Sequence, residues 1–325
     1  MNTLLQVLLL VGGFIFLIKG ADWLVSGASS VAQNFKVSKM LIGLTIIAFG
    51  TGAPELAVSI SALASGSTDM VLGNVIGSNI LNILLLIGVG AVVSPIFVRT
   101  DTVKKELPLC LLISTLLVVL FLDVSLTGAP YNAITRSDGI VCVLFFAVFI
   151  YYLVAMARRN REESKKTKKE KPQYKLGKSI LITIMGLVGV VIGSQMVVNG
   201  ATEIARIIGV SERVIALTVI AFGTSLPELV TTITAAKKNE DDLLVGNIIG
   251  SNIFNICVVL GIPVALFGAI TPKSFEVLDL VMLIVSAVVL YFCARSGQKI
   301  TRAEGAMMLV LFASYYSIIV MGAIA

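Results

Sequence analysis

Three kinds of residue are scarce in this sequence, and each shortage excludes a class of protein. Charged residues occupy only 14% of the 325 positions against 57% for hydrophobic residues, which is too little polar surface for a soluble globular protein. Histidine is absent, which removes the commonest proton relay and transition-metal ligand. The cysteines lie in apolar stretches without paired spacing, so they predict neither a disulfide framework nor a zinc site: Cys110, Cys142, Cys257 and Cys293.

Long apolar runs dominate the chain instead. A membrane-spanning helix takes about 20 apolar residues, and ten candidate spans lie at residues 4–31, 39–65, 70–94, 107–122, 139–157, 179–205, 213–236, 243–268, 277–293 and 303–325. We interpret the first run as a span and not a cleaved signal peptide, because no basic residue precedes it and no convincing small-residue cleavage site follows. The sequence therefore predicts an all-α polytopic membrane protein with ten transmembrane helices.

The longest hydrophilic stretch, residues 158–178, separates two halves of five spans each, residues 1–157 and 179–325. The loops on the same side as this linker carry 20 of the 25 Lys and Arg residues and begin near Lys36, Arg99, Arg158, Lys237 and Arg295. By the positive-inside rule we expect the linker to be cytoplasmic, beside anionic lipid, and both termini to face outward from the cell membrane.

The two halves contain an internal repeat. A shift of 173 residues aligns 44–83 with 217–256, and 22 of these 40 positions are identical. Weaker matches extend upstream, where Gly20 and Gly27 meet Gly193 and Gly200. Because each half has an odd number of spans, the second copy enters the membrane from the opposite side. The pattern predicts two inverted five-helix repeats, an arrangement typical of secondary transporters with a site at the repeat interface.

The first repeated motif is IAFGTGAPEL at 47–56 and IAFGTSLPEL at 220–229. Glu55 and Glu228 lie in apolar segments, where an ionised carboxylate is costly unless it is paired, solvated or bound to a cation. Neither motif contains Lys or Arg. Thr51 and Thr224 each precede their glutamate by four residues, so hydroxyl and carboxylate share one helix face. A protonated glutamate hydrogen-bonded across helices is the structural alternative.

Prolines in the same motif favour a broken helix. Pro54 and Pro227 have no backbone N–H, so the carbonyls of Gly50 and Gly223 lose their usual helical partners. Carbonyls freed in this way are ready ligands for a hard cation.

The second repeated motif is GNVIGSNILNI at 73–83 and GNIIGSNIFNI at 246–256. Ser78 and Asn82 are four residues apart, as are Ser251 and Asn255, so each pair shares a helix face. The GxxxG pairs of glycines permit close helix packing. We interpret the remaining motif asparagines as interhelical hydrogen-bond partners in preference to ion ligands: Asn74, Asn79, Asn247 and Asn252.

Together the two motifs predict a cation site at mid-membrane. Opposite insertion brings Glu55 and Glu228 together among hydroxyl, amide and carbonyl oxygens. Their charge of −2 is matched by one Ca²⁺ or by two Na⁺, and Mg²⁺ is disfavoured because it loses its hydration water reluctantly. Competition for shared ligands is the physical basis of exchange between the two ions.

Other functions fit less well. A Ca²⁺/H⁺ antiporter could use the same glutamates as proton carriers. An intramembrane hydrolase would need a nucleophile and a base, and the repeats hold no catalytic aspartate pair. A channel is compatible with the ligand chemistry, but an inverted repeat with one site favours alternating access. We expect no enzyme activity, no cofactor, no nucleic-acid binding and no obligatory protein partner, only Na⁺ and Ca²⁺ as substrates in a lipid bilayer.

At these motifs the sequence resembles the Ca²⁺/cation antiporter superfamily, in its prokaryotic sodium/calcium exchanger branch. The resemblance covers both signatures, GT(S/G)xPE and GSNxxN, in the right order, and the ten-span layout covers essentially the whole chain. It implies Na⁺/Ca²⁺ exchange by alternating access, with the first and sixth spans sliding against a fixed core. The implied ion ligands are Thr51, Glu55, Ser78, Asn82, Thr224, Ser225, Glu228, Ser251 and Asn255, with the carbonyls of Ala48 and Ala221.

Two positions refine what the resemblance implies. Gly52 stands where the family often has serine, so the hydroxyl present as Ser225 in the second repeat is missing in the first, and the usual three-for-one stoichiometry does not follow. Asn255 stands where potassium-dependent members carry aspartate, which favours K⁺ independence. Proton-coupled exchangers carry Asn-Ala-x-Glu in place of Gly-Ser-Asn. The sequence leaves open whether Asp22, Glu203 or Asp279 takes part.

Overall fold

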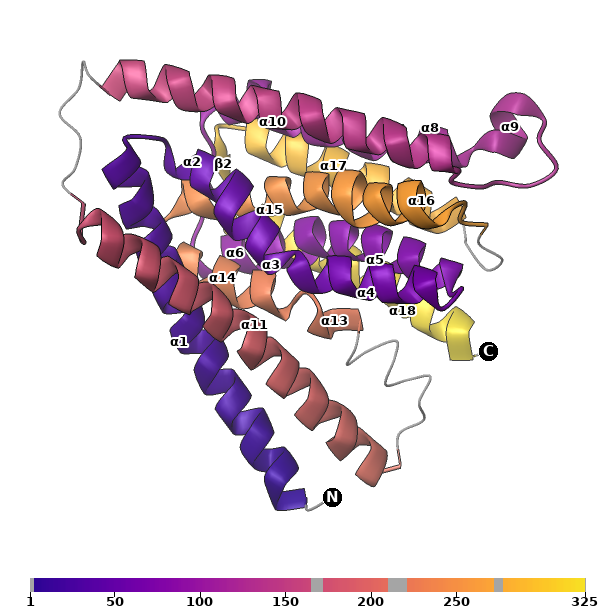
Figure 1. The fold of residues 1–325 in the computed structure, drawn as a ribbon, viewed down its shortest axis with the longest axis horizontal. Helices are drawn as coiled ribbons and strands as arrows, with labels where there is room; N and C mark the ends of the chain where they lie inside the picture. Colours follow the sequence, from indigo (N-terminus) through magenta and orange to yellow (C-terminus); the bar gives the residue numbers. More distant parts are fainter. Residues whose placement is uncertain (1–2, 165–171, 210–220, 272–276, 325) are drawn as a thin grey trace.

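The computed structural model describes residues 3–164, 172–209, 221–271 and 277–324, which are mostly helical (Figure 1). The elements run in the order α1 (Thr3–Phe35), α2 (Lys39–Ile42), η1 (Gly43–Ile47), α3 (Ala48–Thr51), α4 (Ala53–Ala64), α5 (Thr68–Leu81), η2 (Asn82–Ile87), α6 (Gly88–Val93), β1 (Ile96–Phe97), α7 (Thr100–Lys104), α8 (Glu106–Phe121), α9 (Asp123–Thr127), α10 (Arg136–Ser164), α11 (Leu176–Ile207), α13 (Ala221–Gly223), α14 (Leu226–Lys237), α15 (Asp241–Phe254), η4 (Asn255–Leu260), α16 (Gly261–Phe267), α17 (Val277–Arg295), β2 (Lys299–Ile300) and α18 (Arg302–Ile324). The elements labelled η are π-helical, a form frequent at functional sites.

The helices confirm a membrane protein. Seven described helices are long and apolar enough to cross a bilayer, and the bent pair Lys39–Thr51 and Ala53–Ala64 makes eight if it is one span. Of the other two predicted spans, the fourth is α8, whose 16 residues give about 24 Å of helix against a hydrocarbon core of about 30 Å. The seventh, 213–236, begins outside the described residues. The number ten therefore stays a prediction.

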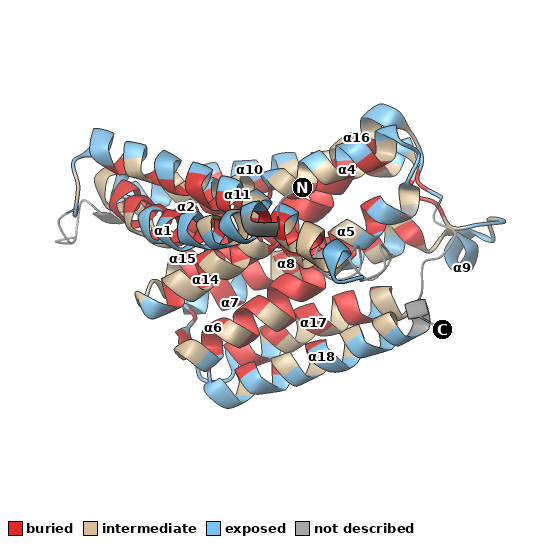
Figure 2. Ribbon diagram, turned by 90° about the horizontal axis from the view of Figure 1, so that it is seen from below, coloured by how far each residue is buried: buried red, intermediate tan, exposed pale blue. Residues whose placement is uncertain are grey.

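The spans divide into a buried core and a lipid-facing surround. The two spans that carry the second motif, Met70–Val93 and Asp241–Phe267, are 78% and 89% buried, whereas Arg136–Glu162 and Arg302–Met321 are each 17% buried. Figure 2 shows the exposed faces of α10 and α18 turned outward. Large apolar side chains such as Leu144 and Val148 make up the exposed face of α10, as contact with lipid requires.

The helices α1 and α11 pack closely along a line of glycines. Gly20 lies against Gly186, and Gly13 lies against Gly193, so the two helices run antiparallel. Gly13 and Gly20 correspond to Gly186 and Gly193 under the same shift of 173 residues, so the contact joins equivalent positions of the two repeats. A Cβ added at Gly20 would lie 2.9 Å from the Gly186 carbonyl oxygen, closer than side chains allow. Small residues are therefore required here.

The loops that the charge pattern assigns to one side of the membrane do gather at one end of the molecule. Strands β1 and β2 pair antiparallel, with Ile96 opposite Ile300. Asn160 Nδ2 donates to Ser38 Oγ at 2.9 Å, and the Tyr174 N–H donates to Ser30 Oγ at 3.0 Å. We call this end, formed by loops beginning near residues 36, 99, 158, 237 and 295, the basic end. The loops at Ile134 and Ile270, predicted for the other side, pair with each other.

We predict that Gly186→Ala destabilises the α1–α11 contact. The new methyl group would lie 2.8 Å from the Gly20 carbonyl oxygen, and overpacking of this kind costs about 1–3 kcal/mol. The melting midpoint in detergent should fall by several degrees. All four cysteines are free and buried, so a thiol-reactive dye reports the unfolding.

Gly177→Ala on the same helix is the matched control. No described atom lies within 4 Å of a Cβ built at Gly177, so its midpoint should stay that of the unaltered protein. Equal midpoints for the two variants would contradict the proposed role of the glycine line.

Candidate functional site

The first motif breaks its helix where the proline predicts it. Helix α3 ends at Thr51, and α4 resumes after Gly52 with Pro54 in its first turn, where a missing N–H costs nothing. The two segments are bent by 43°. Glu55 is 2% exposed, and its Oε2 has no hydrogen-bond partner among the described residues. Thr51 Oγ1 donates to the Ile47 carbonyl at 3.0 Å, which leaves the lone pairs of its oxygen available.

The second motif has the same break. Helix α13 ends at Gly223, and α14 begins at Leu226 with Pro227 in its first turn. Glu228 is 1% exposed, and its Oε2 has no partner among the described residues; the same holds for the hydroxyls of Thr224 and Ser225. A buried polar atom without a partner is rare and needs an explanation, such as a bound ion or water.

The carbonyls that lose their helical partner because of the prolines differ in hydrogen bonding between the two repeats. Ser194 Oγ on α11 donates to the Gly223 carbonyl at 2.9 Å. The position equivalent to Ser194 in the first repeat is Ala21, which has no hydroxyl. No local pattern in the sequence points to Ser194, because it lies 29 residues before its acceptor. The Gly223 carbonyl is thus already hydrogen-bonded, whereas no described side-chain hydroxyl donates to the Gly50 carbonyl.

A network of hydrogen bonds between asparagine side chains joins the two repeats. Asn82 Nδ2 donates to Asn252 Oδ1 at 3.0 Å, and Asn255 Nδ2 donates to Asn79 Oδ1 at 3.4 Å. These two bonds are equivalent under the repeat. Asn252 Nδ2 also donates to the Asn79 carbonyl at 3.3 Å. Asn79 and Asn252 are therefore interhelical partners, as the sequence predicts, and Asn82 and Asn255 each keep an unpartnered Oδ1.

The other motif asparagines differ between the repeats. Asn74 Nδ2 donates to the Glu55 carbonyl at 3.2 Å and to Ser59 Oγ at 3.1 Å, which confirms its interhelical role. Its equivalent, Asn247, is 1% exposed and makes no side-chain hydrogen bond among the described residues. The predicted interhelical bond is thus present in the first repeat only.

The helices cross so that each glutamate meets the other repeat. Helix α4 packs against η4, and α14 packs against η2. Glu55 lies close enough to Glu228 for the two carboxylates to repel each other, and the Thr51 hydroxyl of the first motif lies beside Glu228 of the second. Buried oxygens of the predicted ligands in both repeats have no hydrogen-bond partner among the described residues: Glu55 Oε2, Asn82 Oδ1, Thr224 Oγ1, Ser225 Oγ, Glu228 Oε2, Ser251 Oγ and Asn255 Oδ1.

This oxygen-only set suits a hard cation. Within the described residues no cluster of three or more His, Cys, Asp and Glu side chains could hold a metal, because only two members of the set are carboxylates and the rest are neutral oxygens. Ser78 is also buried. The Ala48 carbonyl accepts the Gly52 N–H at 3.0 Å and has a second lone pair. Ala221 opens α13.

The three acidic residues that the sequence left open have partners elsewhere. Asp22 Oδ1 lies 2.6 Å from Lys238 Nζ. Glu203 lies 2.5 Å from Arg206 on the same helix. Asp279 accepts the Tyr315 hydroxyl at 2.7 Å. None of these contacts involves a residue of the oxygen set.

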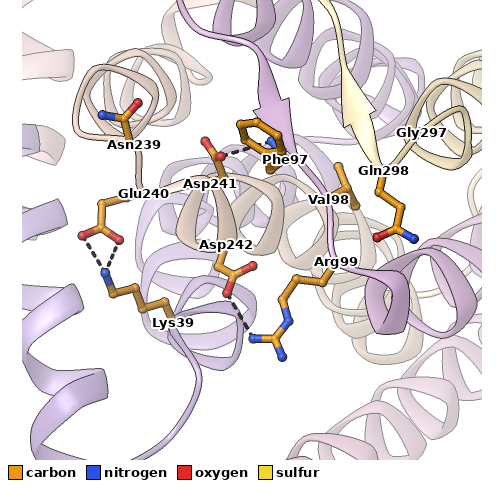
Figure 3. Close-up of a pocket in the computed structure, with 10 residues that line it drawn as sticks. All are labelled: Lys39, Phe97, Val98, Arg99, Asn239, Glu240, Asp241, Asp242, Gly297 and Gln298. Atoms are coloured by element: carbon orange, nitrogen blue, oxygen red, sulfur yellow. Dashed lines mark hydrogen bonds and ion pairs between the residues drawn. The ribbon is translucent and has the colours of Figure 1, made fainter. Parts of the chain in front are cut away.

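A second acidic cluster lies at the basic end, lining a cavity of about 530 Å³ (Figure 3). Lys39 Nζ lies 2.7 Å from Glu240 Oε2, and Arg99 lies 3.5 Å from Asp242. Asp241 Oδ2 accepts the Phe97 N–H at 3.1 Å. These carboxylates already have donors or cations, unlike Glu55 and Glu228, so the cavity is not the ion site.

The same end ties α1 to the turn between α14 and α15. Lys238 Nζ donates to Ser26 Oγ at 2.6 Å in addition to its ion pair with Asp22. Ser29 Oγ donates to Glu240 Oε1 at 2.9 Å. Polar contacts therefore connect the first helix to the helices that carry the second motif.

Comparison with known proteins gives one family. A family model described as sodium/calcium exchanger protein matches residues 5–155 and 178–321. CaxA of Alkalimonas amylolytica is 39% identical over 313 residues, which cover 93% of this chain and 95% of CaxA. The sodium/calcium exchanger MaX1 of Methanosarcina acetivorans is 32% identical over 342 residues, covering 95% and 96% of the two proteins.

Comparison of the fold with solved structures leads to the same family. The solved structure of the sodium-calcium exchanger NCX_Mj soaked with 10 mM Na⁺ and zero Ca²⁺ is similar to this chain with a TM-score of 0.82 and 32% identity, over 98% of this chain and 99% of that chain.

We predict that Asn252→Ala destabilises the contact between repeats. It removes the acceptor of Asn82 and the donor to the Asn79 carbonyl, and interhelical side-chain hydrogen bonds contribute about 0.6–2 kcal/mol in membranes. The helical signal in circular dichroism should melt several degrees lower than for Asn247→Ala, which removes an amide without a described partner. A larger loss in Asn247→Ala would contradict the assignment.

Proposed function

This chain belongs to the sodium/calcium exchanger family, and on that premise we propose that it carries Na⁺ and Ca²⁺ in opposite directions through one site built around Glu55 and Glu228. It is a secondary antiporter and not an enzyme.

The observation that carries the proposal is the pair of buried carboxylates that repel each other without a partner cation. Each glutamate has an oxygen without a described hydrogen-bond partner, and no Lys or Arg appears among the described ion pairs of either residue. Removing one partner of a buried charge pair typically costs about 3–5 kcal/mol, so two lone carboxylates side by side are unfavourable. A cation taken from water relieves both the desolvation and the repulsion.

The same pair explains how two different ions can share the site. One Ca²⁺ or two Na⁺ neutralises the charge of −2, and Ca²⁺ takes six to eight oxygen ligands in flexible geometry. We assign as ligands the residues that the sequence suggests: the side chains of Thr51, Glu55, Ser78, Asn82, Thr224, Ser225, Glu228, Ser251 and Asn255, with the carbonyls of Ala48 and Ala221. The unpartnered oxygens of both repeats support this assignment.

Exchange requires that the loaded site and not the empty one change sides. A neutralised site can pass the hydrophobic barrier, whereas the empty site carries two charges and resists the passage. We propose that α1 and α11 move as a pair against the core of α4, α5, α14 and α15. Their antiparallel packing through equivalent glycines supports an inverted repeat, with ten spans arranged as 1–157 and 179–325 around the linker 158–178.

The orientation follows from charge. We propose that the basic end faces the cytoplasm and that both termini face outward across the cell membrane, because Lys and Arg concentrate in the loops of that end. Family membership and the similarity to the sodium/calcium exchanger MaX1 favour sodium over protons as the coupling ion. Asn255 in place of an aspartate supports exchange without K⁺.

The decisive experiment is radioactive calcium uptake into proteoliposomes preloaded with Na⁺ and diluted into Na⁺-free medium. The unaltered protein should take up Ca²⁺ only when Na⁺ is inside. Glu55→Gln and Glu228→Gln should each abolish this uptake, because the glutamine leaves the site with a charge of −1 and can no longer balance Ca²⁺.

Glu203→Gln is the matched control, since Glu203 pairs with Arg206 at a partly exposed position. Its uptake should match that of the unaltered protein. Uptake driven only by a pH gradient would replace sodium with protons as the coupling ion. Uptake that survives both glutamine substitutions would overturn the site itself.

A further inference from the structure

Among the positions proposed as ligands, one differs between the two halves of the ion site. Ser225 follows Thr224 in the second repeat, whereas Gly52 follows Thr51 in the first. Ser225 is 2% exposed, and its hydroxyl has no partner among the described residues, so it is an oxygen available to a cation. Gly52 supplies no side-chain oxygen at all.

The space beside Gly52 is filled by an aromatic ring. A Cβ built at Gly52 would lie 2.9 Å from Cδ1 and 3.2 Å from Cε1 of Phe254. Side chains essentially never approach so closely, so Phe254 and any residue larger than glycine at position 52 exclude each other unless the ring moves.

Neighbouring rings hold Phe254 in place. It stacks on Phe49 with ring centroids 5.0 Å apart and an interplanar angle of 24°. Phe146 meets it edge-on at 6.3 Å and also contacts Phe49 at 5.6 Å. Offset-stacked and edge-to-face pairs of this kind stabilise a cluster beyond the burial of its area. The ring cannot turn away without disrupting these contacts.

The equivalent pair of positions holds a different combination. The position equivalent to Phe254 of the second repeat is Leu81 of the first, and the position equivalent to Gly52 of the first repeat is Ser225 of the second. Glycine thus accompanies phenylalanine in one pair of positions, and serine accompanies leucine in the equivalent pair. The two changes together replace an oxygen ligand by a hydrocarbon surface that has no lone pair to offer.

We propose that Gly52 and Phe254 set the ion stoichiometry of this exchanger at two Na⁺ for one Ca²⁺, so that transport moves no net charge. This inference rests on the proposed function. Two Na⁺ neutralise the two glutamates as one Ca²⁺ does, whereas a third Na⁺ would leave a positive charge at a position where Gly52 of the first repeat offers no hydroxyl and Phe254 of the second repeat presents an aromatic ring.

The balance point of exchange in proteoliposomes tests the proposal. At zero net flux, two Na⁺ per Ca²⁺ make the calcium gradient equal to the square of the sodium gradient, independent of membrane potential. Three Na⁺ would make it follow the cube and shift with a potential set by valinomycin and K⁺. A balance point that shifts with potential in the unaltered protein would overturn the proposal.

A paired substitution tests the two residues. Gly52→Ser with Phe254→Leu places at these two positions the serine and leucine found at the equivalent positions, Ser225 and Leu81. In this double variant we expect the calcium gradient at zero net flux to approach the cube of the sodium gradient and to depend on membrane potential. Phe254→Leu alone is the control. Its calcium gradient at zero net flux should still equal the square of the sodium gradient, because the substitution adds no oxygen. A double variant that keeps the square would overturn the assignment to this pair.

These results are distinct from failure of the proposed function. If the unaltered protein shows no sodium-dependent calcium uptake, the exchanger assignment itself fails. If uptake depends on sodium but its balance point follows the cube, the exchanger assignment stands and the stoichiometry is wrong.

Discussion

Two carboxylates buried side by side without a positive residue between them are the constraint on which the rest of this structure depends. Glu55 and Glu228 are 2% and 1% exposed, and a charge in such surroundings is costly unless a counter-charge arrives from outside. Among the described ion pairs none brings a lysine or arginine to either glutamate. A permanently bound side-chain cation would neutralise the pair and leave no charge for a mobile cation to balance.

Other features keep these carboxylates close while allowing them to be reached. Broken helices place each glutamate in the first turn of a new helix, where the helix dipole stabilises negative charge. The bonds from Asn82 to Asn252 and from Asn255 to Asn79 fix the core of the two repeats to each other. By contrast, α1 and α11 meet along glycines, with hydrogen bonds joining Ser30 and Asn34 to Ser179 at the basic end.

Much of the site could be predicted from the sequence because each motif position occurs in two copies that can be compared. Proline and glycine in the first motif predict the helix breaks, and the glutamates predict the charge of the site. The pairing of Asn79 with Asn255 could not be predicted, since both residues had several partners within reach and only the crossing of the helices decides. Ser194 and Phe254 were missed for a related reason, because each acts on a residue distant in sequence: Ser194 hydrogen-bonds to the Gly223 carbonyl, and the Phe254 ring lies against Gly52.

The fourth predicted span shows what apolar length alone leaves undecided. Residues 107–122 correspond to α8, which has 16 residues, packs against α17 on one face and exposes Leu112 and Val119 on another. Hydropathy measures how readily a segment leaves water, and it does not distinguish burial against protein from burial against lipid. Tertiary packing decides between them.

The contacts of α1 at the basic end make the two ends of the molecule chemically unequal. Asp22 and Ser26 on α1 contact Lys238 in the turn between α14 and α15. Their equivalents in the second repeat are Gln195 and Asn199, which instead bond to each other at 2.8 Å. Partly exposed ion pairs weaken as ionic strength rises, whereas neutral amide bonds do not. Salt therefore weakens the contact of α1 with the turn between α14 and α15, whereas the equivalent residues of α11 form a bond within their own helix that salt does not screen.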